Sequence, residues 1–255
     1  MKAKKIDLTV MMSVWRKDDP NLLKQAICSI LNQTLLPNYL LIGIDGPVTK
    51  KLELVINEFS KRSNVKIFWF KENRGLAWVL NDLLREVQTE LVGRMDADDF
   101  SLAERFEKQI PFFSNDPELS VLGAGINMVN NKSEKLRNYP TDHNSIFDRC
   151  PFRNPIAHPT VIIRTNALKS VGGYPEIRRC QDWALWGLML SKGYKFGNLS
   201  LPVLDYRTGE NFKERRNLQY LKDELSVIRF FRKIGFISIG KAFLSSLLRI
   251  AVRII

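Results

Sequence analysis

The feature that most constrains the fold is a regular alternation of short apolar runs and amphipathic segments in the N-terminal part of the chain. The apolar runs cover residues 7–14, 39–45, 65–70 and 91–95, and they have the length and composition of buried strands. Segments with apolar residues at helical spacing lie between them. Because strand–helix–strand units place successive strands parallel, we predict an α/β fold with a mostly parallel sheet flanked by helices.

Ordinary start signals mark the predicted helices. Asp18 and Asp19 precede Pro20, and an acidic cap followed by a proline in the first turn is typical of a helix N-terminus. Residues 75–87 carry leucines at helical spacing and predict another helix. Both helices would connect neighbouring strands of the predicted sheet.

The second half of the chain alternates less regularly. Residues 118–126 and 158–164 predict strands, and residues 181–193 predict a helix that ends at a glycine. The stretch 130–155 is polar and rich in turn-forming residues, so we predict a long loop there.

The charge of the chain points to a polyanionic partner. Lysine and arginine outnumber aspartate and glutamate by 39 to 27, which gives a formal net charge of +12. Such a balance suits a nucleic acid, a phosphorylated substrate or an anionic membrane surface. The excess is concentrated in residues 211–255, where basic and apolar residues alternate and predict a basic amphipathic helical tail. A helix that merely packs on the domain is the alternative.

Several classes of protein are excluded. Cys28, Cys150 and Cys180 lie far apart without a CxxC pair, and the chain has only two histidines, which argues against a disulfide scaffold or a Cys/His zinc site. No window reaches the roughly 18 uncharged apolar residues that span a bilayer, and the N-terminus lacks a signal-peptide pattern. We expect a cytoplasmic protein, or one attached to a membrane from the cytoplasmic side.

Polar side chains follow each of the four predicted parallel strands. Ligands in open α/β sheets bind outside the carboxyl ends of the strands, so these positions are candidates for one binding site. They are Ser13, Trp15, Asp45, Asn73, Arg74, Asp96, Asp98 and Asp99.

The acidic cluster in the stretch RMDADDF, residues 94–100, is the strongest of these candidates. Clustered carboxylates repel one another, and a divalent cation removes that cost. Mg²⁺ or Mn²⁺ is typically held by one or two carboxylates with phosphate oxygens and water completing the shell. Asp96 and Asp98 alternate and therefore point the same way from an extended strand end. A solvated acidic turn is the alternative, which the position after a fourth parallel strand disfavours.

Two other strand-end residues have competing interpretations. Asp45 suits the acceptor of a base or ribose group, although a helix N-cap is an equally good reading of its local sequence. Arg74 precedes a predicted helix and suits a nucleotide phosphate or base, but a surface arginine is the default interpretation of a lone residue.

The second half contributes a candidate general base. Asp182 lies beside aromatic residues that could exclude water and raise its pKa, although a carboxylate at a helix N-terminus is the alternative. His158 could line the same pocket, but a lone histidine is more often structural. The aromatic pair Trp183 and Trp186 is better explained by packing than by stacking on a ligand.

Taken together, the motifs VMMSVWR, ICSILNQT, IDGP, ENRGLAWVLN, RMDADD, NPIAHPTVIIR, VGGYPE and CQDWALWGLML resemble the family 2 glycosyltransferases of the GT-A fold. The resemblance runs from about Ile6 to about Arg207 and is carried by the ordered set rather than by any one motif. It is nearest to bacterial enzymes that build O-antigen and other polysaccharide repeat units on a polyprenyl-diphosphate lipid.

The resemblance implies a domain plan. Residues 1–210 would form the GT-A catalytic domain, with a nucleotide-sugar half at about 1–100 and an acceptor half at about 101–210. The basic tail, 211–255, would attach the protein to the inner face of the cytoplasmic membrane, where the lipid acceptor lies.

The resemblance also implies residue roles. The base and ribose of a UDP-sugar would be surrounded by Ser13, Trp15, Asp45 and Arg74. The DxD motif of the family corresponds to Asp96 and Asp98, with Asp98 binding Mn²⁺ or Mg²⁺, Asp96 binding the ribose or the same metal, and Asp99 in a supporting or capping position. Asp182 would be the catalytic base, and acceptor or pocket residues would be His158, Gln181 and Trp183.

These roles imply an inverting, metal-dependent hexosyltransferase that adds one β-linked sugar and releases its product. We expect galactose or glucose to move from a UDP-sugar onto a polyprenyl-diphosphate-linked GlcNAc or GalNAc. The chain departs from the family pattern at Gln181, where a glutamate is usual, which puts that residue's acceptor contact in question. The Gln-x-x-Arg-Trp motif of the processive members is absent.

Two alternatives remain open from the sequence. A nucleotidyltransferase on a related α/β sheet would carry a glycine-rich loop after the first strand, but that position reads MSVWRKDDP. A basic nucleic-acid-binding protein is indicated by charge alone, and no DNA- or RNA-binding motif supports it. We therefore expect no nucleic acid partner.

Overall fold

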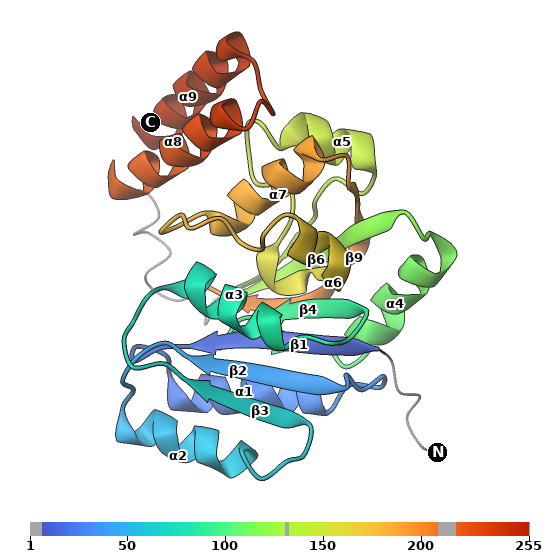
Figure 1. The fold of residues 1–255 in the computed structure, drawn as a ribbon, viewed down its shortest axis with the longest axis vertical. Helices are drawn as coiled ribbons and strands as arrows, with labels where there is room; N and C mark the ends of the chain where they lie inside the picture. The colour runs from blue at the N-terminus through green and yellow to red at the C-terminus, as the bar shows by residue number, and fades with distance from the viewer. Residues whose placement is uncertain (1–6, 131–132, 209–217, 255) are drawn as a thin grey trace.

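A computed structural model describes residues 7–130, 133–208 and 218–254. It contains a nine-stranded mixed sheet with helices on both faces (Figure 1). Eight of its strands are in the order β3-β2-β1-β4-β8-β6-β9-β5, and β7 pairs with β6. The strands are β1 (Leu8–Val14), β2 (Tyr39–Ile44), β3 (Val65–Trp69), β4 (Leu91–Met95), β5 (Phe100–Ser101), β6 (Leu119–Asn130), β7 (Ser133–Arg137), β8 (Ile162–Arg164) and β9 (Lys195–Arg207).

Helices cover both faces of this sheet and form the C-terminal end of the described chain (Figure 1). They are α1 (Pro20–Leu31), α2 (Lys50–Phe59), α3 (Leu76–Glu86), α4 (Arg105–Asn115), α5 (His143–Arg149), the 3₁₀ helix η1 (His158–Thr160), α6 (Thr165–Ser170), α7 (Gln181–Ser191), α8 (Leu218–Lys233) and α9 (Ile239–Ile254).

Alternation along the strands divides the core into two layers. Val10 and Met12 pack with α1, α2 and α4, whereas Met11 between them packs with α3 and α7 on the opposite face. Successive side chains of a strand point to opposite faces, so a strand that is apolar throughout must be covered on both. This explains why the N-terminal strands read as continuous apolar runs.

The parallel arrangement predicted for the first half is confirmed. β1 pairs in parallel with both β2 and β4, and β2 pairs in parallel with β3. Asp19 caps α1 by accepting hydrogen bonds from the backbone N–H groups of Asn21 and Leu22, as the start signal predicts.

The second half departs from the prediction of a mostly parallel sheet. β8 runs antiparallel to both β4 and β6, and β5 runs antiparallel to β9. Only β6 and β9 pair in parallel among the described strands of this half. In the first half each pair of successive strands from β1 to β4 is joined through a helix, which suits parallel pairing, whereas β6 and β7 are neighbours in the sequence and pair antiparallel.

Two local predictions in the second half were wrong. Within 130–155, predicted as a loop, β7 and α5 form, and Asp142 caps α5 through the backbone N–H of Ser145. The predicted strand 158–164 is extended only at β8, because His158–Thr160 forms a 3₁₀ turn in which the Thr160 hydroxyl donates to the carbonyl oxygen of Ala157. Proline at the second position of that turn cannot donate to a strand ladder.

The C-terminal segment forms two helices that pack against each other, and α8 also packs on α7. Phe231 of α8 lies against Gly187 of α7, where even a Cβ atom would approach the phenyl ring to 2.1 Å. No described helix is both long and apolar enough to cross a membrane. Residues 211–217, which belong to the predicted tail, lie outside the described residues.

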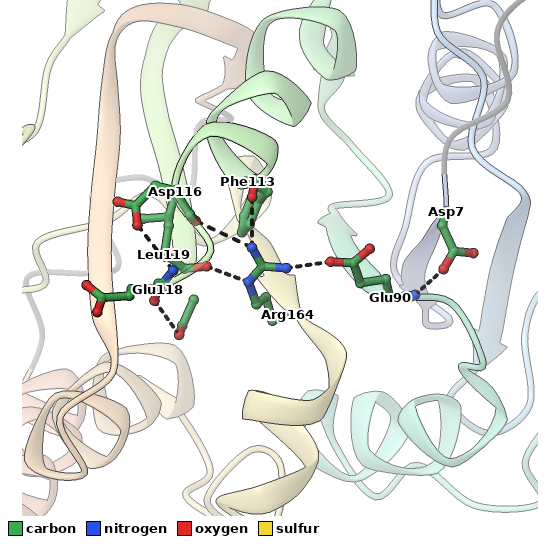
Figure 2. Close-up of polar contacts among 8 residues, drawn as sticks. Asp7, Glu90, Phe113, Asp116, Glu118, Leu119 and Arg164 are labelled. Carbon is green, nitrogen blue, oxygen red and sulfur yellow. Dashed lines mark hydrogen bonds and ion pairs between the residues drawn. The ribbon is translucent and has the colours of Figure 1, made fainter.

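Arg164, at the end of β8, joins the two halves of the sheet (Figure 2). Its guanidinium donates to the carbonyl oxygens of Leu119 (2.9 Å) and Phe113 (2.8 Å), in the second half. It also pairs with Glu90, which precedes β4 and whose backbone N–H donates to Asp7. One side chain thus links β8, α4, β6 and the start of β4.

We predict that Arg164→Ala lowers the free energy of unfolding by about 2–4 kcal/mol, because two partly buried carbonyl oxygens lose a charged donor and the Phe113 ring loses its contact with the guanidinium. Urea denaturation measures the change. Arg85→Ala, which removes an exposed arginine paired with Asp82, is the matched control and should cost under about 1 kcal/mol. An Arg164→Ala loss no larger than that of the control would contradict the role given to Arg164.

Candidate active site

The carboxyl ends of β1, β2 and β4 lie side by side at one edge of the sheet. Met12 pairs with Met95, and Val14 pairs with Ile44, so the residues that follow these strands emerge together. The parallel register therefore brings the strand-end candidates of the sequence to one place, as expected for an open α/β sheet.

The acidic cluster lies directly after β4. Oxygens of Asp96, Asp98 and Asp99 lie within 4.8 Å of one another. Asp99 is 1% exposed, and its Oδ1 accepts from the backbone N–H of Arg207 at 3.0 Å, while its Oδ2 has no hydrogen-bond partner among the described residues. The Arg207 guanidinium donates to the carbonyl oxygen of Asp98 and to Gln25. Arg207 thus ties the end of β9 to the cluster.

Carboxyl groups in and beside the cluster have raised pKa values. Loss of solvation and the charge of Asp96 raise the pKa of Asp98 to about 6, although this side chain reaches the surface. Burial, Asp96 and Asp98 raise the pKa of Asp99 well above its usual range. Partial burial also raises the pKa of Asp18, in the loop after β1, to about 7, with the charges of Asp98 and Asp96 contributing.

These residues fit a divalent cation. They offer only carboxylate oxygens, one of them buried and without a partner, and hard ions such as Mg²⁺ and Mn²⁺ prefer oxygen ligands. Asp96 and Asp98 are the predicted ligands, and Asp99 lies close enough to share the ion. Asp99 caps no helix, since α4 begins later and its N-cap residue is Glu104.

Arg94 is the positive centre of the site. This β4 residue is 3% exposed and forms an ion pair with Asp96, and its Nε has no hydrogen-bond partner within the described part of the chain. Burial alone would lower the pKa of its guanidinium, but the interaction with Asp96 raises that pKa overall. Its charge also acts on Asp182, His158 and Tyr174, so the acidic cluster and the predicted base share one buried cation.

Asp182 lies in the first turn of α7, where the exposed N–H groups of the helix favour a carboxylate. Its Oδ2 accepts a hydrogen bond of 2.6 Å from the side-chain amide of Asn154. Burial raises its pKa, while hydrogen bonds from the Trp183 backbone and from Asn154 oppose that rise. A carboxylate with a raised pKa and a fixed orientation is suited to general-base chemistry.

Asp45 organises the loop that enters α3. Its carboxylate accepts hydrogen bonds from the backbone N–H groups of Arg74 (2.8 Å) and Gly75 (3.0 Å) and from the amide of Asn73 (2.9 Å). It does not cap α2, because Thr49 does. The predicted ribose or base contact of Asp45 therefore stays a prediction, beside a role in holding the loop.

Arg74 points along α3 rather than freely into solvent. It forms an ion pair with Asp82, and its guanidinium lies 5.2 Å and 5.7 Å from the ring centroids of Phe70 and Trp78. Contact with a nucleotide would add to or replace these interactions. At the end of β1, Ser13 is half-buried and Trp15 is 42% exposed, which leaves the indole available to a ligand.

The predicted pocket residues of the second half are more deeply buried. The Nε2 of His158 lies 3.0 Å from the Tyr174 hydroxyl, and burial together with Arg94 lowers the histidine pKa well below its usual range. Gln181 is also buried. Trp183 is 2% exposed and donates to the carbonyl oxygen of Cys150, which favours the packing interpretation of its indole.

The sequence reasoning did not single out Arg94, Asp18, Asn154 or Arg207 as site residues. An arginine within an apolar strand was an available signal for Arg94, since a buried charge needs a partner. Asp18 was assigned to helix capping, but its Oδ2 accepts from the backbone N–H of Trp15 while Asp19 caps α1. Arg207 contacts Asp99 although it lies more than a hundred residues away in the sequence, and no local sequence pattern predicts that contact.

Comparison with known proteins agrees with this geometry. The sequence profile of "Glycosyl transferase family 2" matches residues 9–170, which include the four parallel strands and the acidic cluster. The chain belongs to this family of glycosyltransferases.

Curated relatives place it near bacterial polysaccharide enzymes. It is 31% identical over 234 residues to the amylovoran biosynthesis glycosyltransferase AmsE of Erwinia amylovora, covering 90% of this chain and 88% of AmsE. It is 30% identical over 251 residues to a UDP-Gal:α-D-GlcNAc-diphosphoundecaprenol β-1,3-galactosyltransferase of Escherichia coli, covering 97% of this chain and 91% of that enzyme.

Solved structures share the fold, which is therefore the GT-A arrangement expected from the sequence. A structure of S. aureus TarS in complex with UDP-GlcNAc matches with a TM-score of 0.68 at 16% identity, over 88% of this chain and 66% of that one. The mannosyltransferase PcManGT of Pyrobaculum calidifontis, in complex with GDP-Man and Mn²⁺, matches with a TM-score of 0.66 at 13% identity, over 96% of this chain and 70% of that one. The chain spans 38% of the length of the longer TarS structure.

The raised pKa of Asp18 gives a stability prediction for the metal-free protein. The folded state binds a proton at Asp18 up to about pH 7, whereas the unfolded chain releases it near its ordinary pKa of 3.8. The Asp18 contribution to the free energy of unfolding therefore falls as pH rises through this window. Asp18→Asn should gain stability relative to wild type by at least about 1 kcal/mol between about pH 5 and about pH 8, since one pKa unit corresponds to about 1.4 kcal/mol.

Urea denaturation in EDTA at both pH values measures the difference. Asp148→Asn, an exposed position on α5, is the matched control. A difference between Asp18→Asn and wild type that stays constant with pH would count against the electrostatic account of the cluster.

Proposed function

We propose that the protein transfers one hexose, galactose or glucose, from a UDP-sugar to a hydroxyl of a polyprenyl-diphosphate-linked GlcNAc or GalNAc. The product would carry a β linkage and would enter O-antigen or another surface polysaccharide. The names of its relatives support this class of donor and acceptor, since the E. coli relative is named for UDP-Gal and a GlcNAc-diphosphoundecaprenol. The name of the amylovoran biosynthesis relative supports the polysaccharide context.

One observation carries the proposal: two separate carboxylate sites gather around Arg94. The cluster of Asp96, Asp98 and Asp99 suits a cation-bound diphosphate, and Asp182 is a single carboxylate held in place by Asn154. A direct displacement on a nucleotide-sugar needs both functions, one at the leaving group and one at the attacking hydroxyl.

Asp182 would act as the general base. Its carboxylate takes the proton of the acceptor hydroxyl while that oxygen forms a bond to the anomeric carbon of the donor. The bond from the anomeric carbon to the diphosphate breaks, and UDP leaves with the electron pair. A single displacement inverts the anomeric configuration, so an α-linked donor gives a β-glycoside.

The acidic cluster would hold the leaving group. When bound, Mn²⁺ or Mg²⁺ supplies Lewis-acid stabilisation of the departing diphosphate. Asp98 and Asp96 would hold the ion, and Asp99 lies close enough to assist. Arg94 keeps a compensating positive charge beside Asp96 whether or not the ion is present.

The donor nucleotide would lie over the ends of β1 and β2. Trp15 offers an exposed ring for stacking, Ser13 a hydroxyl, and Arg74 a guanidinium at the entry of α3. Asp45 holds that entry through Arg74 and Gly75, so it would support the nucleotide pocket even where it makes no direct contact.

The acceptor would approach from the side of α7. His158 and Gln181 remain the proposed pocket residues there, together with Asn154, which orients the base. We propose a division into a catalytic domain, 1–210, and a C-terminal segment, 211–255, and a single addition per binding event. A lipid-linked acceptor would place the reaction at the inner face of the cytoplasmic membrane.

Product analysis tests the proposal. The purified protein is incubated with Mn²⁺, UDP-galactose or UDP-glucose, and a polyprenyl-diphosphate-linked GlcNAc, and the products are identified by mass. We expect free UDP and a lipid-linked disaccharide in equal amounts, and no transfer in EDTA. Release of pyrophosphate instead of UDP would indicate a nucleotidyltransferase, and the absence of UDP with every donor and acceptor tried would refute the proposal.

We predict that Asp182→Asn lowers kcat by about 10²–10⁴-fold, the usual contribution of a positioned general base. The substitution keeps the shape of the side chain, so affinity for UDP, measured by calorimetry, should change by less than about threefold. In the wild type, turnover should fall as pH is lowered through a value above the ordinary aspartate range, because burial raises the pKa of Asp182.

Asp148→Asn, on the exposed surface of α5, is the matched control and should leave turnover unchanged. An Asp182→Asn enzyme that keeps more than about a tenth of wild-type turnover would remove Asp182 as the base.

A further inference from the structure

Helix α9 turns its apolar side chains away from the protein. Ile239 and Phe243 are 69% and 67% exposed, and Val252, at the other end of the helix, is 59% exposed. Leu244, Leu247 and Leu248 between them are also exposed. A contiguous apolar stripe along a whole helix is unusual on a protein surface and marks an interaction site.

The inner side of the same helix carries Ala242, which packs on the core, but is otherwise marked by polar contacts. Arg253 donates to the carboxylate of Glu224 in α8 at 3.0 Å and 3.2 Å, and Arg249 lies 3.7 Å from that carboxylate. Ser245, which is fully buried, donates to the carbonyl oxygen of Pro151 at 2.7 Å. A surface helix ordinarily places its apolar side on the core and its charges in water, so α9 has the reverse orientation.

The exposed charges around this stripe all have one sign. Within the described residues 218–254, both acidic side chains, Asp223 and Glu224, are buried and paired. The exposed charged residues of the same segment are Lys222, Arg229, Arg232, Lys233 and Lys241. Arg229 and Arg232 line a groove of about 340 Å³ between α8 and α9, whose other wall includes Ile239 and Phe243.

We infer that α9 binds an anionic phospholipid bilayer through its outward face, with its apolar side chains inserted at the interface and the surrounding basic residues at the level of the lipid phosphates. An apolar face bordered by lysine and arginine is the physical pattern of helices that lie in a membrane interface. The exclusively basic rim matches the negative surface of such a bilayer.

The position of the hairpin α8–α9 fits this orientation. It lies at one end of the molecule, with α7 between it and the sheet (Figure 1). Ser245 of α9 holds the segment that leads from Pro151 to Asn154, the partner of Asp182. Docking through α9 would therefore bring the acceptor side of the site to the membrane, where a lipid-linked acceptor lies. This biological reason rests on the proposed function, whereas the binding itself does not.

The structure changes the basis of the membrane prediction made from sequence. Arg249 and Arg253 contributed to the basic count of the tail, but they point inward and neutralise Glu224. The apolar stripe, rather than those two charges, is what α9 presents to a partner.

Co-sedimentation of the full chain with lipid vesicles, without donor or acceptor, tests the inference. We expect binding to vesicles of phosphatidylcholine mixed with phosphatidylglycerol and much weaker binding to phosphatidylcholine alone. The double variant Phe243→Gln with Leu247→Gln should bind the mixed vesicles at least about tenfold more weakly, because it removes buried apolar area. Phe112→Gln with Leu54→Gln removes the same side-chain types from exposed positions on α4 and α2 and should bind like wild type.

The basic rim is tested separately. Arg229→Gln with Arg232→Gln should weaken binding to the mixed vesicles by about 30-fold, which corresponds to about 1 kcal/mol for each arginine, and should leave the weak binding to phosphatidylcholine unchanged. Lys51→Gln with Lys61→Gln, two exposed lysines outside the hairpin, controls for net charge.

Equal vesicle binding by wild type and the Phe243/Leu247 variant would overturn the inference. A concentration-dependent dimer in sedimentation velocity that the same variant abolishes would also overturn it, because the stripe would then bind a second copy. Asp182→Asn should bind vesicles like wild type while losing transfer, so vesicle binding and the proposed reaction can fail independently. Circular dichroism confirms that each variant is folded.

Discussion

The site depends on an electrostatic balance at the end of β4. Three carboxylates emerge there together, and the buried guanidinium of Arg94, two residues before Asp96, forms an ion pair with that aspartate. Arg105, which is fully buried in α4, donates to the carbonyl oxygen of Arg94 and has its pKa lowered to about 9 by burial and by the Arg94 charge. The positive charges are therefore costly themselves and persist because the carboxylates are close.

The nearby positive charges do not fully compensate the carboxylates. Asp99 keeps a buried oxygen that has no partner in residues 7–130, 133–208 and 218–254, and the pKa values of Asp18, Asp98 and Asp99 are all raised. Carboxylates whose charge was fully neutralised by the protein would attract a cation only weakly. The protein tolerates the remaining repulsion at one edge of the sheet, where apolar layers on both faces supply the stability.

The sequence predicts where the strand-end candidates lie because its information there is local. Each parallel strand is an apolar run, and Asp45 and Asp96 directly follow β2 and β4, so the register of the neighbouring strands brings these two residues to the same edge of the sheet. The proposed acceptor side is assembled from distant segments. His158 forms a hydrogen bond with Tyr174, and Asp182 accepts one from Asn154. No periodicity in the sequence predicts either pair.

The errors of prediction have the same origin. The stretch 130–155 looks like a loop because its polar residues form an edge strand and a short helix, whose stability comes from β6, β9 and the α7 side of the core rather than from their own composition. Nothing in the sequence around Arg164 indicates its structural role, yet its guanidinium donates hydrogen bonds to four different residues.

The C-terminal hairpin α8–α9 adds further distant contacts, because it supports α7, the helix that carries the proposed base Asp182. Cys180, immediately before α7, has a φ of 58°, a left-handed conformation that a non-glycine residue adopts only when its surroundings impose it. Helix α8 flanks that position: Asp223 lies 3.8 Å from Arg179, and Tyr220 forms a hydrogen bond with the Cys180 side chain. With α9 holding Pro151 on the other side, the two segments that orient Asp182 are both attached to the hairpin. The orientation of Asp182, the proposed base, therefore depends on residues beyond the span that the family profile matches, which ends at residue 170.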